Sequence, residues 1–258
     1  MRGHVTVALL GAALLAAVAI GPASADVLAR AAAVELPNLV PLPAGGVHVG
    51  TPDGGGPGNV LRFDTSTANR GTVALDLLAE PTDPTLQTAA ASQCIEWATH
   101  RACVARQEVG RFVIHPEHGH AHLEDYALYE LRRLDDGGDV DFSEEGLVAT
   151  GGKVSFCLID VEQDRSPDHL VYEQPHPLYY TCLAVPGGFQ GISPGWRDVY
   201  GAGLEGQQIE LAGVPDGTYA LVITVDPDNF LLEADDTDNV SAVRLRLSGG
   251  GSVVSVLG

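Results

Sequence analysis

The chain has 258 residues, and its 34 acidic residues outnumber its 14 basic ones, which gives a formal net charge of −20 at pH 7. An acidic surface repels nucleic acid and anionic lipid, so neither is expected as a partner, whereas cationic partners or substrates are favoured. Charge alone does not separate this interpretation from plain solubility. The length is sufficient for one sizeable hydrophobic core.

The first 25 residues have the pattern of a secretory signal peptide. Arg2 supplies the positive start, Val5 to Ile20 form an apolar run, and Ala23-Ser24-Ala25 is a small-residue cleavage site. A membrane-spanning helix needs ~20 apolar residues, so this run is short for one, and no other segment is apolar enough. We expect a secreted protein without a membrane span in its mature form. An uncleaved anchor is the alternative.

The next part of the chain is rich in alanine, proline and glycine. This composition predicts a flexible N-terminal arm over residues 26–58. One folded domain is expected over residues 59–248. The run Gly249-Gly250-Gly251 begins a flexible tail that we expect over residues 249–258.

The domain contains many short apolar runs separated by turn residues such as Asp135-Asp136-Gly137-Gly138 and Pro215-Asp216-Gly217. This spacing predicts an all-β, sandwich-like fold with few short helices, of which Thr85 to His100 is the best candidate. The predicted strands are Val60 to Phe63, Val73 to Leu78, Arg111 to Ile114, His118 to Leu131, Val154 to Ile159, Ile209 to Ala212, Tyr219 to Val225 and Val240 to Leu247.

Three histidines alternate in the segment His118-Gly119-His120-Ala121-His122. In a strand, alternate side chains point to the same face, so the three imidazoles could share one metal ion. A helix would direct them to diverging faces. A histidine-rich surface loop is the alternative interpretation.

The four cysteines fit an oxidising compartment, because an even number can pair completely. Three pairings are possible. We favour Cys94 with Cys103, which closes a short local loop, and Cys157 with Cys182, which would join two strands. A site in which all four cysteines bind zinc is a weaker alternative, because the chain has no C-x-x-C pair.

Lys153 is the only lysine in the chain, since the other 13 basic residues are arginine. A general bias toward arginine explains those 13 residues but does not explain why one position kept lysine. An arginine side chain cannot act as an amine nucleophile, whereas a lysine side chain can. The single lysine is therefore a modest indication of chemistry.

These residues belong to a longer ordered pattern. Its segments are His118-x-His120-x-His122, Gly152-Lys153-Val154-Ser155-Phe156-Cys157-Leu158-Ile159-Asp160, Gln190-Gly191-Ile192-Ser193-Pro194-Gly195, Asp198-Val199-Tyr200-Gly201, Val214-Pro215-Asp216-Gly217-x-Tyr219, Asp226-Pro227 and Leu232-Glu233-Ala234-Asp235. In this order they resemble the catalytic domain of the lysyl oxidase family, over roughly residues 59–247. The chain departs from the animal members in having fewer cysteines and extra residues around Val161 to His176. These departures leave the substrate open more than the cofactor chemistry.

The resemblance implies roles for particular residues. His118, His120 and His122 match the family's copper(II) ligands, and His115 also has a family counterpart. Lys153 and Tyr200 match the two residues that are joined covalently as lysine tyrosylquinone.

The resemblance also implies a reaction. A primary amine, with peptidyl lysine among the candidate substrates, would be converted with molecular oxygen to an aldehyde, ammonia and hydrogen peroxide. A carboxylate is expected as the catalytic base. Asp198 is the first candidate because it lies two residues from Tyr200, and Asp125 is the second.

Two other classes of function remain open at this point. The chain could be a secreted β-sandwich that binds metal without catalysis, in adhesion or copper sequestration. It could also be a metal-dependent enzyme without a quinone, such as a zinc hydrolase. A quinone chromophore and peroxide release from a primary amine would distinguish the oxidase from both.

Overall fold

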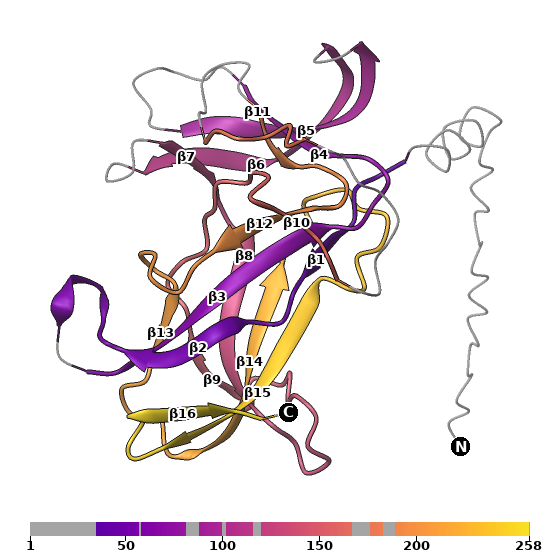
Figure 1. The fold of residues 1–258 in the computed structure, drawn as a ribbon. Coiled ribbons are helices and arrows are strands. Elements are labelled where there is room, and N and C mark those ends of the chain that lie inside the picture. Colours follow the sequence, from indigo (N-terminus) through magenta and orange to yellow (C-terminus); the bar gives the residue numbers. More distant parts are fainter. Residues whose placement is uncertain are drawn as a thin grey trace, which may run out of the picture. The chain divides into compact units, whose positions relative to one another are not determined.

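A computed structural model describes residues 35–56, 58–80, 88–99, 102–115, 120–166, 176–182 and 189–257. Apart from one short 3-10 helix at Asp53–Gly55, the regular elements in these ranges are β-strands (Figure 1). The predicted all-β fold is confirmed. No helix among the described residues is long and apolar enough to cross a membrane. The expected signal peptide, residues 1–25, lies outside the described residues.

Three antiparallel sheets make up the described fold. The first has six strands, of which β3 is the long central one. Strands β1, β2, β12 and β13 all pair with β3, and β10 pairs with β12. The strands of this sheet are β1 (Leu39–Pro41), β2 (Gly45–Gly50), β3 (Val60–Asn69), β10 (Glu162–Gln163), β12 (Trp196–Tyr200) and β13 (Gln208–Glu210).

The other two sheets have five strands each. The second runs in the order β11 (Phe189–Ile192), β4 (Leu75–Ala79), β5 (Thr88–Thr99), β6 (Ala102–His115) and β7 (His120–Leu123). The third runs in the order β16 (Val253–Val256), β15 (Val240–Ser248), β14 (Gly217–Val225), β8 (Ala127–Arg133) and β9 (Leu147–Thr150).

The hydrophobic core contains residues of all three sheets, and the sheet of β3 and the sheet of β14 face one another in Figure 1. Alternate residues of β3 point inward, as the two-residue period of a strand requires. On β3, Leu61 and Phe63 are fully buried, and Thr65 and Thr67 continue the same face. The inner face of β3 therefore changes from apolar to polar along the strand. The change occurs beside Tyr200 of β12, which pairs with Thr65 of β3.

Three expectations about local structure need correction. The helix expected over Thr85 to His100 is wrong, because Thr88–Thr99 forms β5 and pairs along its length with β6. The arm expected over residues 26–58 contains β1 and β2 in its described part, and both are paired with β3. The expected flexible tail contains β16, which pairs with β15. In each case backbone pairing with another strand overrides the local composition.

Two predicted strands differ in detail. The segment His118 to Leu131 is divided into β7 and β8 by a turn at which Asp125 has a positive φ of 54°. The segment Val154 to Ile159 is not a continuous strand, although Phe156 forms an isolated bridge with Leu123 at the end of β7. This bridge joins the histidine strand to the segment that follows Lys153.

Both favoured disulfides are confirmed: Cys94 is bonded to Cys103, and Cys157 to Cys182. The first joins the two strands of the β5–β6 hairpin, and the second joins two segments that each make backbone hydrogen bonds with β7. A zinc site made of the four cysteines is therefore ruled out.

Candidate active site

Two of the three alternating histidines lie in the described part of the chain. His120 and His122 are on the same face of β7, as the strand period requires, and their Nε2 atoms are 2.9 Å apart. His122 is buried and His120 is half-buried. His118 and the side chain of His115 lie outside the described residues.

The spacing of these two nitrogens fits a shared metal ion. Two ligands that each lie about 2.0–2.1 Å from an ion, at a right angle to one another, are about 2.9 Å apart. A right angle between nitrogen ligands is typical of tetragonal Cu(II) sites. Within the described residues there is no group of three or more His, Cys, Asp or Glu side chains that could hold a metal. A complete site would need a further ligand from elsewhere.

Ser155 contacts the other ring nitrogen of His122. Its Oγ lies 3.5 Å from His122 Nδ1, which is a long contact. A group that holds one nitrogen of a histidine orients the ring and directs the other nitrogen toward a ligand. Sequence reasoning did not single out Ser155. Its position two residues after Lys153, on the same extended segment, was the available signal.

The single lysine and the tyrosine of the Asp-x-Tyr-Gly motif lie together. Lys153 Nζ is 5.4 Å from the centroid of the Tyr200 ring and 5.2 Å from that of the Phe156 ring. Phe156 meets Tyr200 edge to face, with 4.9 Å between the ring centroids. The amine therefore lies beside two aromatic rings that hold each other in place.

The loop after β12 packs closely against the lysine stem. Gly206 has a positive φ of 75°, and a Cβ added at this glycine would come within 2.9 Å of Lys153 Cβ. Only glycine meets both conditions without strain. Burial lowers the pKa of Lys153, although Glu205, Asp198 and Asp53 act in the opposite direction. A lowered pKa makes the neutral, nucleophilic amine more accessible.

The Tyr200 hydroxyl is held by one residue's backbone. It donates a hydrogen bond to the Cys157 carbonyl at 2.7 Å and accepts one from the Cys157 N–H at 2.8 Å. Burial, and then the nearby Asp198, raise the pKa of Tyr200 well above its ordinary value. The phenol is therefore neutral and fixed in orientation, which the motif by itself did not reveal.

Asp198 shares the inner face of β12 with Tyr200 and is almost fully buried. Burial raises its pKa well above the ordinary range, despite a 3.0 Å hydrogen bond from the Val199 N–H. Asp198 and Tyr200 both line a cavity of about 10 Å³, together with Thr65 and Tyr129. This volume is close to what one water molecule requires.

Asp125 has a different environment. It is exposed in the turn between β7 and β8, where Arg111 of β6 is a charged neighbour. Asp198 interacts with both Lys153 and Tyr200. Of the two carboxylates, Asp198 is therefore the one that lies near the lysine and the tyrosine.

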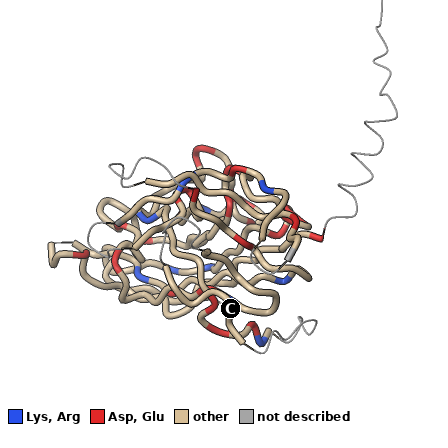
Figure 2. Tube along the Cα trace, turned by 90° about the horizontal axis from the view of Figure 1, so that it is seen from above, with Lys and Arg blue, Asp and Glu red and all other residues tan. Residues whose placement is uncertain are grey.

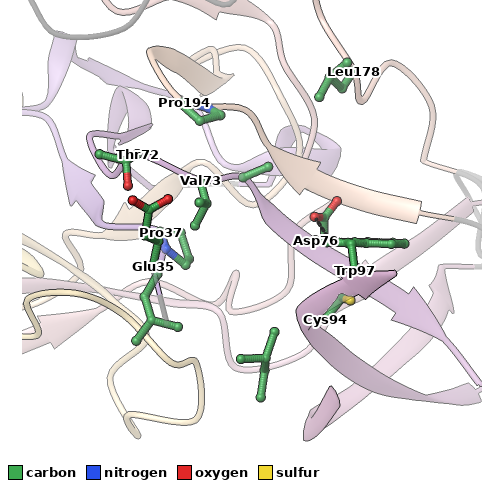
Figure 3. Close-up of a pocket in the computed structure, with 12 residues that line it drawn as sticks. Glu35, Pro37, Thr72, Val73, Asp76, Cys94, Trp97, Leu178 and Pro194 are labelled. Atoms are coloured by element: carbon green, nitrogen blue, oxygen red, sulfur yellow. Dashed lines mark hydrogen bonds between the residues drawn. The ribbon is translucent and has the colours of Figure 1, made fainter. Parts of the chain in front are cut away.

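A second hollow lies apart from these residues. It has a volume of about 290 Å³ and is lined by Asp76 of β4, Trp97 of β5 and Glu35, among others (Figure 3). Trp97 Nε1 donates a hydrogen bond to Asp76 at 2.8 Å, and Tyr179 donates one to its other oxygen. Burial raises the pKa of Asp76 to about 7. Neither the histidines nor Lys153 and Tyr200 line this hollow.

Comparison with known proteins decides the family. The lysyl oxidase family model matches residues 111–256, which include the histidines, Lys153, Asp198 and Tyr200. The chain belongs to the lysyl oxidase family.

The relatives of this lysyl oxidase family chain are larger proteins. It is 32% identical over 136 residues to protein-lysine 6-oxidase of Homo sapiens, a match that covers 52% of this chain and 28% of that protein. The protein-lysine 6-oxidase of Sus scrofa is 31% identical, over 52% of this chain and 47% of that protein. Lysyl oxidase homolog 2 of Gallus gallus is 32% identical over 139 residues, which are 54% of this chain and 15% of that protein. The chain thus spans less than half the length of each relative.

Proposed function

We propose that this protein is a secreted, copper- and quinone-dependent amine oxidase. It converts a primary amine, molecular oxygen and water to an aldehyde, ammonia and hydrogen peroxide. The observation that carries the proposal is the contact between the amine of the chain's only lysine, Lys153, and the ring of Tyr200. A lysine that forms a covalent cofactor with a tyrosine must lie against the ring of that tyrosine, as Lys153 does.

Copper(II) would be held by His118, His120 and His122. The 2.9 Å separation of the His120 and His122 nitrogens supports this donor set, and imidazole binds copper more tightly than other divalent first-row metals. His118 would join them by the same alternation along the strand. Bound copper would supply one-electron redox chemistry with molecular oxygen.

Lys153 and Tyr200 would form lysine tyrosylquinone, which would supply the electrophilic carbonyl for amine oxidation. The backbone of Cys157 holds the Tyr200 hydroxyl, and Phe156 packs against the ring, so the ring cannot turn away from the lysine. The lowered pKa of Lys153 favours the neutral amine that bond formation requires. Arginine could not replace it.

Asp198 would accept and return a proton beside the cofactor. A carboxyl whose pKa is raised by burial exchanges protons closer to neutral pH than an exposed one, which suits general acid–base catalysis. Its interaction with both cofactor residues supports this role.

The substrate is expected to be cationic. Acidic residues are spread over the described part of the chain, and basic residues are fewer (Figure 2). The resulting negative field attracts protonated amines and raises their local concentration. The names of the relatives indicate protein lysine as the first substrate to test.

Peptide mass spectrometry of protein expressed with copper tests the proposal. A crosslinked pair of peptides that contains Lys153 and Tyr200 is expected, together with peroxide release from a primary amine. Recovery of the two peptides separate and unmodified would refute the quinone. If copper were bound in that case, the non-catalytic metal-binding protein would be the better description. The Lys153→Arg variant is the control, because it keeps the charge and cannot form the bond.

A further inference from the structure

Gln190 on β11 is a buried glutamine whose side chain bonds three separate segments of backbone. It is 1% exposed. Its Nε2 donates to the Ala121 carbonyl at 2.8 Å and to the Cys182 carbonyl at 3.3 Å, and its Oε1 accepts from the Leu158 N–H at 3.0 Å. Two carbonyls and one N–H as partners define the orientation of the amide.

Each of these three backbone groups adjoins a residue of the candidate site. Ala121 lies between His120 and His122 on β7. Leu158 follows Cys157, whose peptide groups hold the Tyr200 hydroxyl. Cys182 is disulfide-bonded to Cys157, and its carbonyl also accepts a hydrogen bond from the Ala121 N–H at 3.1 Å. The glutamine thus joins the histidine strand to the segment that holds the tyrosine.

Among the described residues, strand β7 has two further contacts with that segment, one of which is the contact of Ser155 with His122. Leu123 and Phe156 exchange two backbone hydrogen bonds, of 2.7 and 3.0 Å. These bonds hold the end of β7 that lies beyond the histidines, and pairing with β6 holds the other edge of the strand. The bonds at Ala121 hold the strand between its two described histidines, so they fix its position relative to the segment that holds the tyrosine.

Glutamine is the side chain that suits this position. Its amide combines an acceptor with two donors, whereas glutamate has no donor when it is ionised and asparagine is one methylene shorter. A buried polar network of this kind holds its members in one arrangement only when every group is satisfied.

We propose that Gln190 is a positioning residue that sets the distance and angle between the metal-binding histidines and the Lys153–Tyr200 pair. The proposal rests on the proposed function and names a residue outside the metal ligands and the cofactor. Gln190 acts through the backbone of Ala121 and Leu158 and does not contact substrate.

Gln190→Glu is the first test, because the carboxyl group keeps the acceptor for Leu158 but can donate to at most one of the two carbonyls, and only when it is protonated. We expect copper affinity to fall about tenfold or more, the copper EPR spectrum to change, and the yield of the Lys153–Tyr200 crosslink to fall. Gln190→Met has a side chain of similar length that cannot form these hydrogen bonds. It is the variant to use if Gln190→Glu does not fold.

Gln93→Glu is the matched control. Gln93 is also 1% exposed, and it also accepts from a backbone N–H and donates to a backbone carbonyl, both of Leu232 at 2.8 Å. It should lose stability but keep wild-type copper affinity, EPR spectrum and crosslink yield. Wild-type values in folded Gln190 variants, or equal changes in the Gln93 variant, would overturn the proposal.

A readout without copper separates this proposal from the proposed function. In metal-free Gln190→Met protein, the Leu158 and Ala121 amides should exchange hydrogen about tenfold or more faster than in the wild type. If the wild-type protein binds no copper and forms no crosslink, the proposed oxidase function is refuted, but the role of Gln190 in fixing the backbone is not. Unchanged exchange at both amides would overturn the role of Gln190.

Discussion

Replacing Tyr200 by phenylalanine removes one oxygen that makes two part-buried hydrogen bonds. Both are made with Cys157, which is 2% exposed, at 2.7 and 2.8 Å. In the variant the Cys157 N–H and carbonyl lose this partner while the aromatic ring stays in place. A buried polar group left without its partner costs about 1–3 kcal/mol, so the two together predict a loss of about 2–4 kcal/mol after partial relaxation.

The loss should be measured on metal-free protein, in which no crosslink forms in either chain. Thermal and urea unfolding with the disulfides intact give the comparison, and for a domain of this size the loss corresponds to a fall in Tm of about 5–15 °C. Tyr180→Phe is the matched control, because Tyr180 is 69% exposed. That variant should stay within about 0.5 kcal/mol of the wild type.

Equal unfolding free energies for the two variants would refute the reasoning. Such a result would mean that the Tyr200 hydroxyl is not held by the Cys157 backbone, and the argument that the ring is fixed toward the lysine would fall with it. Expressed with copper, the Tyr200→Phe protein should also form no crosslink and release no peroxide, since phenylalanine is not oxidised in this way.

Three further predictions concern the lysine, the serine and the second hollow. Lys153→Arg should fold and bind copper but give no crosslinked peptide and no peroxide, and activity above background would contradict the cofactor assignment. Ser155→Ala should weaken copper binding about tenfold by releasing the His122 ring, with Ser155→Thr closer to the wild type in a calorimetric titration. Burial raises the pKa of Asp76 from 3.8 to about 7, so the folded protein holds a proton that the unfolded chain has lost, and stability should fall as pH rises across that window. Asp76→Asn should flatten this fall in unfolding curves measured at several pH values, although Glu233, whose pKa is raised to about 8, keeps part of the slope.

Local patterns in the sequence were sufficient for several features of this protein. The alternation of histidines predicted a strand with its imidazoles on one face, and this is confirmed for His120 and His122. The short spacing between Cys94 and Cys103 predicted their disulfide. These features depend on a two-residue period and on short loops, which the order of residues defines by itself.

The composition of a single segment misled where pairing with another segment decides. Thr88–Thr99 forms a strand because it pairs with β6, the next strand along the chain, and the glycine-rich residues near the N-terminus form β2 because β3 lies alongside. Propensity within one segment does not report the strand that pairs with it.

The sequence by itself determined which chemistry this chain can carry: a single lysine, alternating histidines and an ordered set of motifs. Tertiary structure alone decided how these groups meet. Three sets of contacts join residues that are distant in the chain. Lys153 contacts Tyr200, the Cys157 backbone hydrogen-bonds to the Tyr200 hydroxyl, and Gln190 hydrogen-bonds to the backbone of other segments. Their cause is the packing of three sheets, because hydrogen-bond partners in a β-fold are assigned by strand pairing across the whole domain.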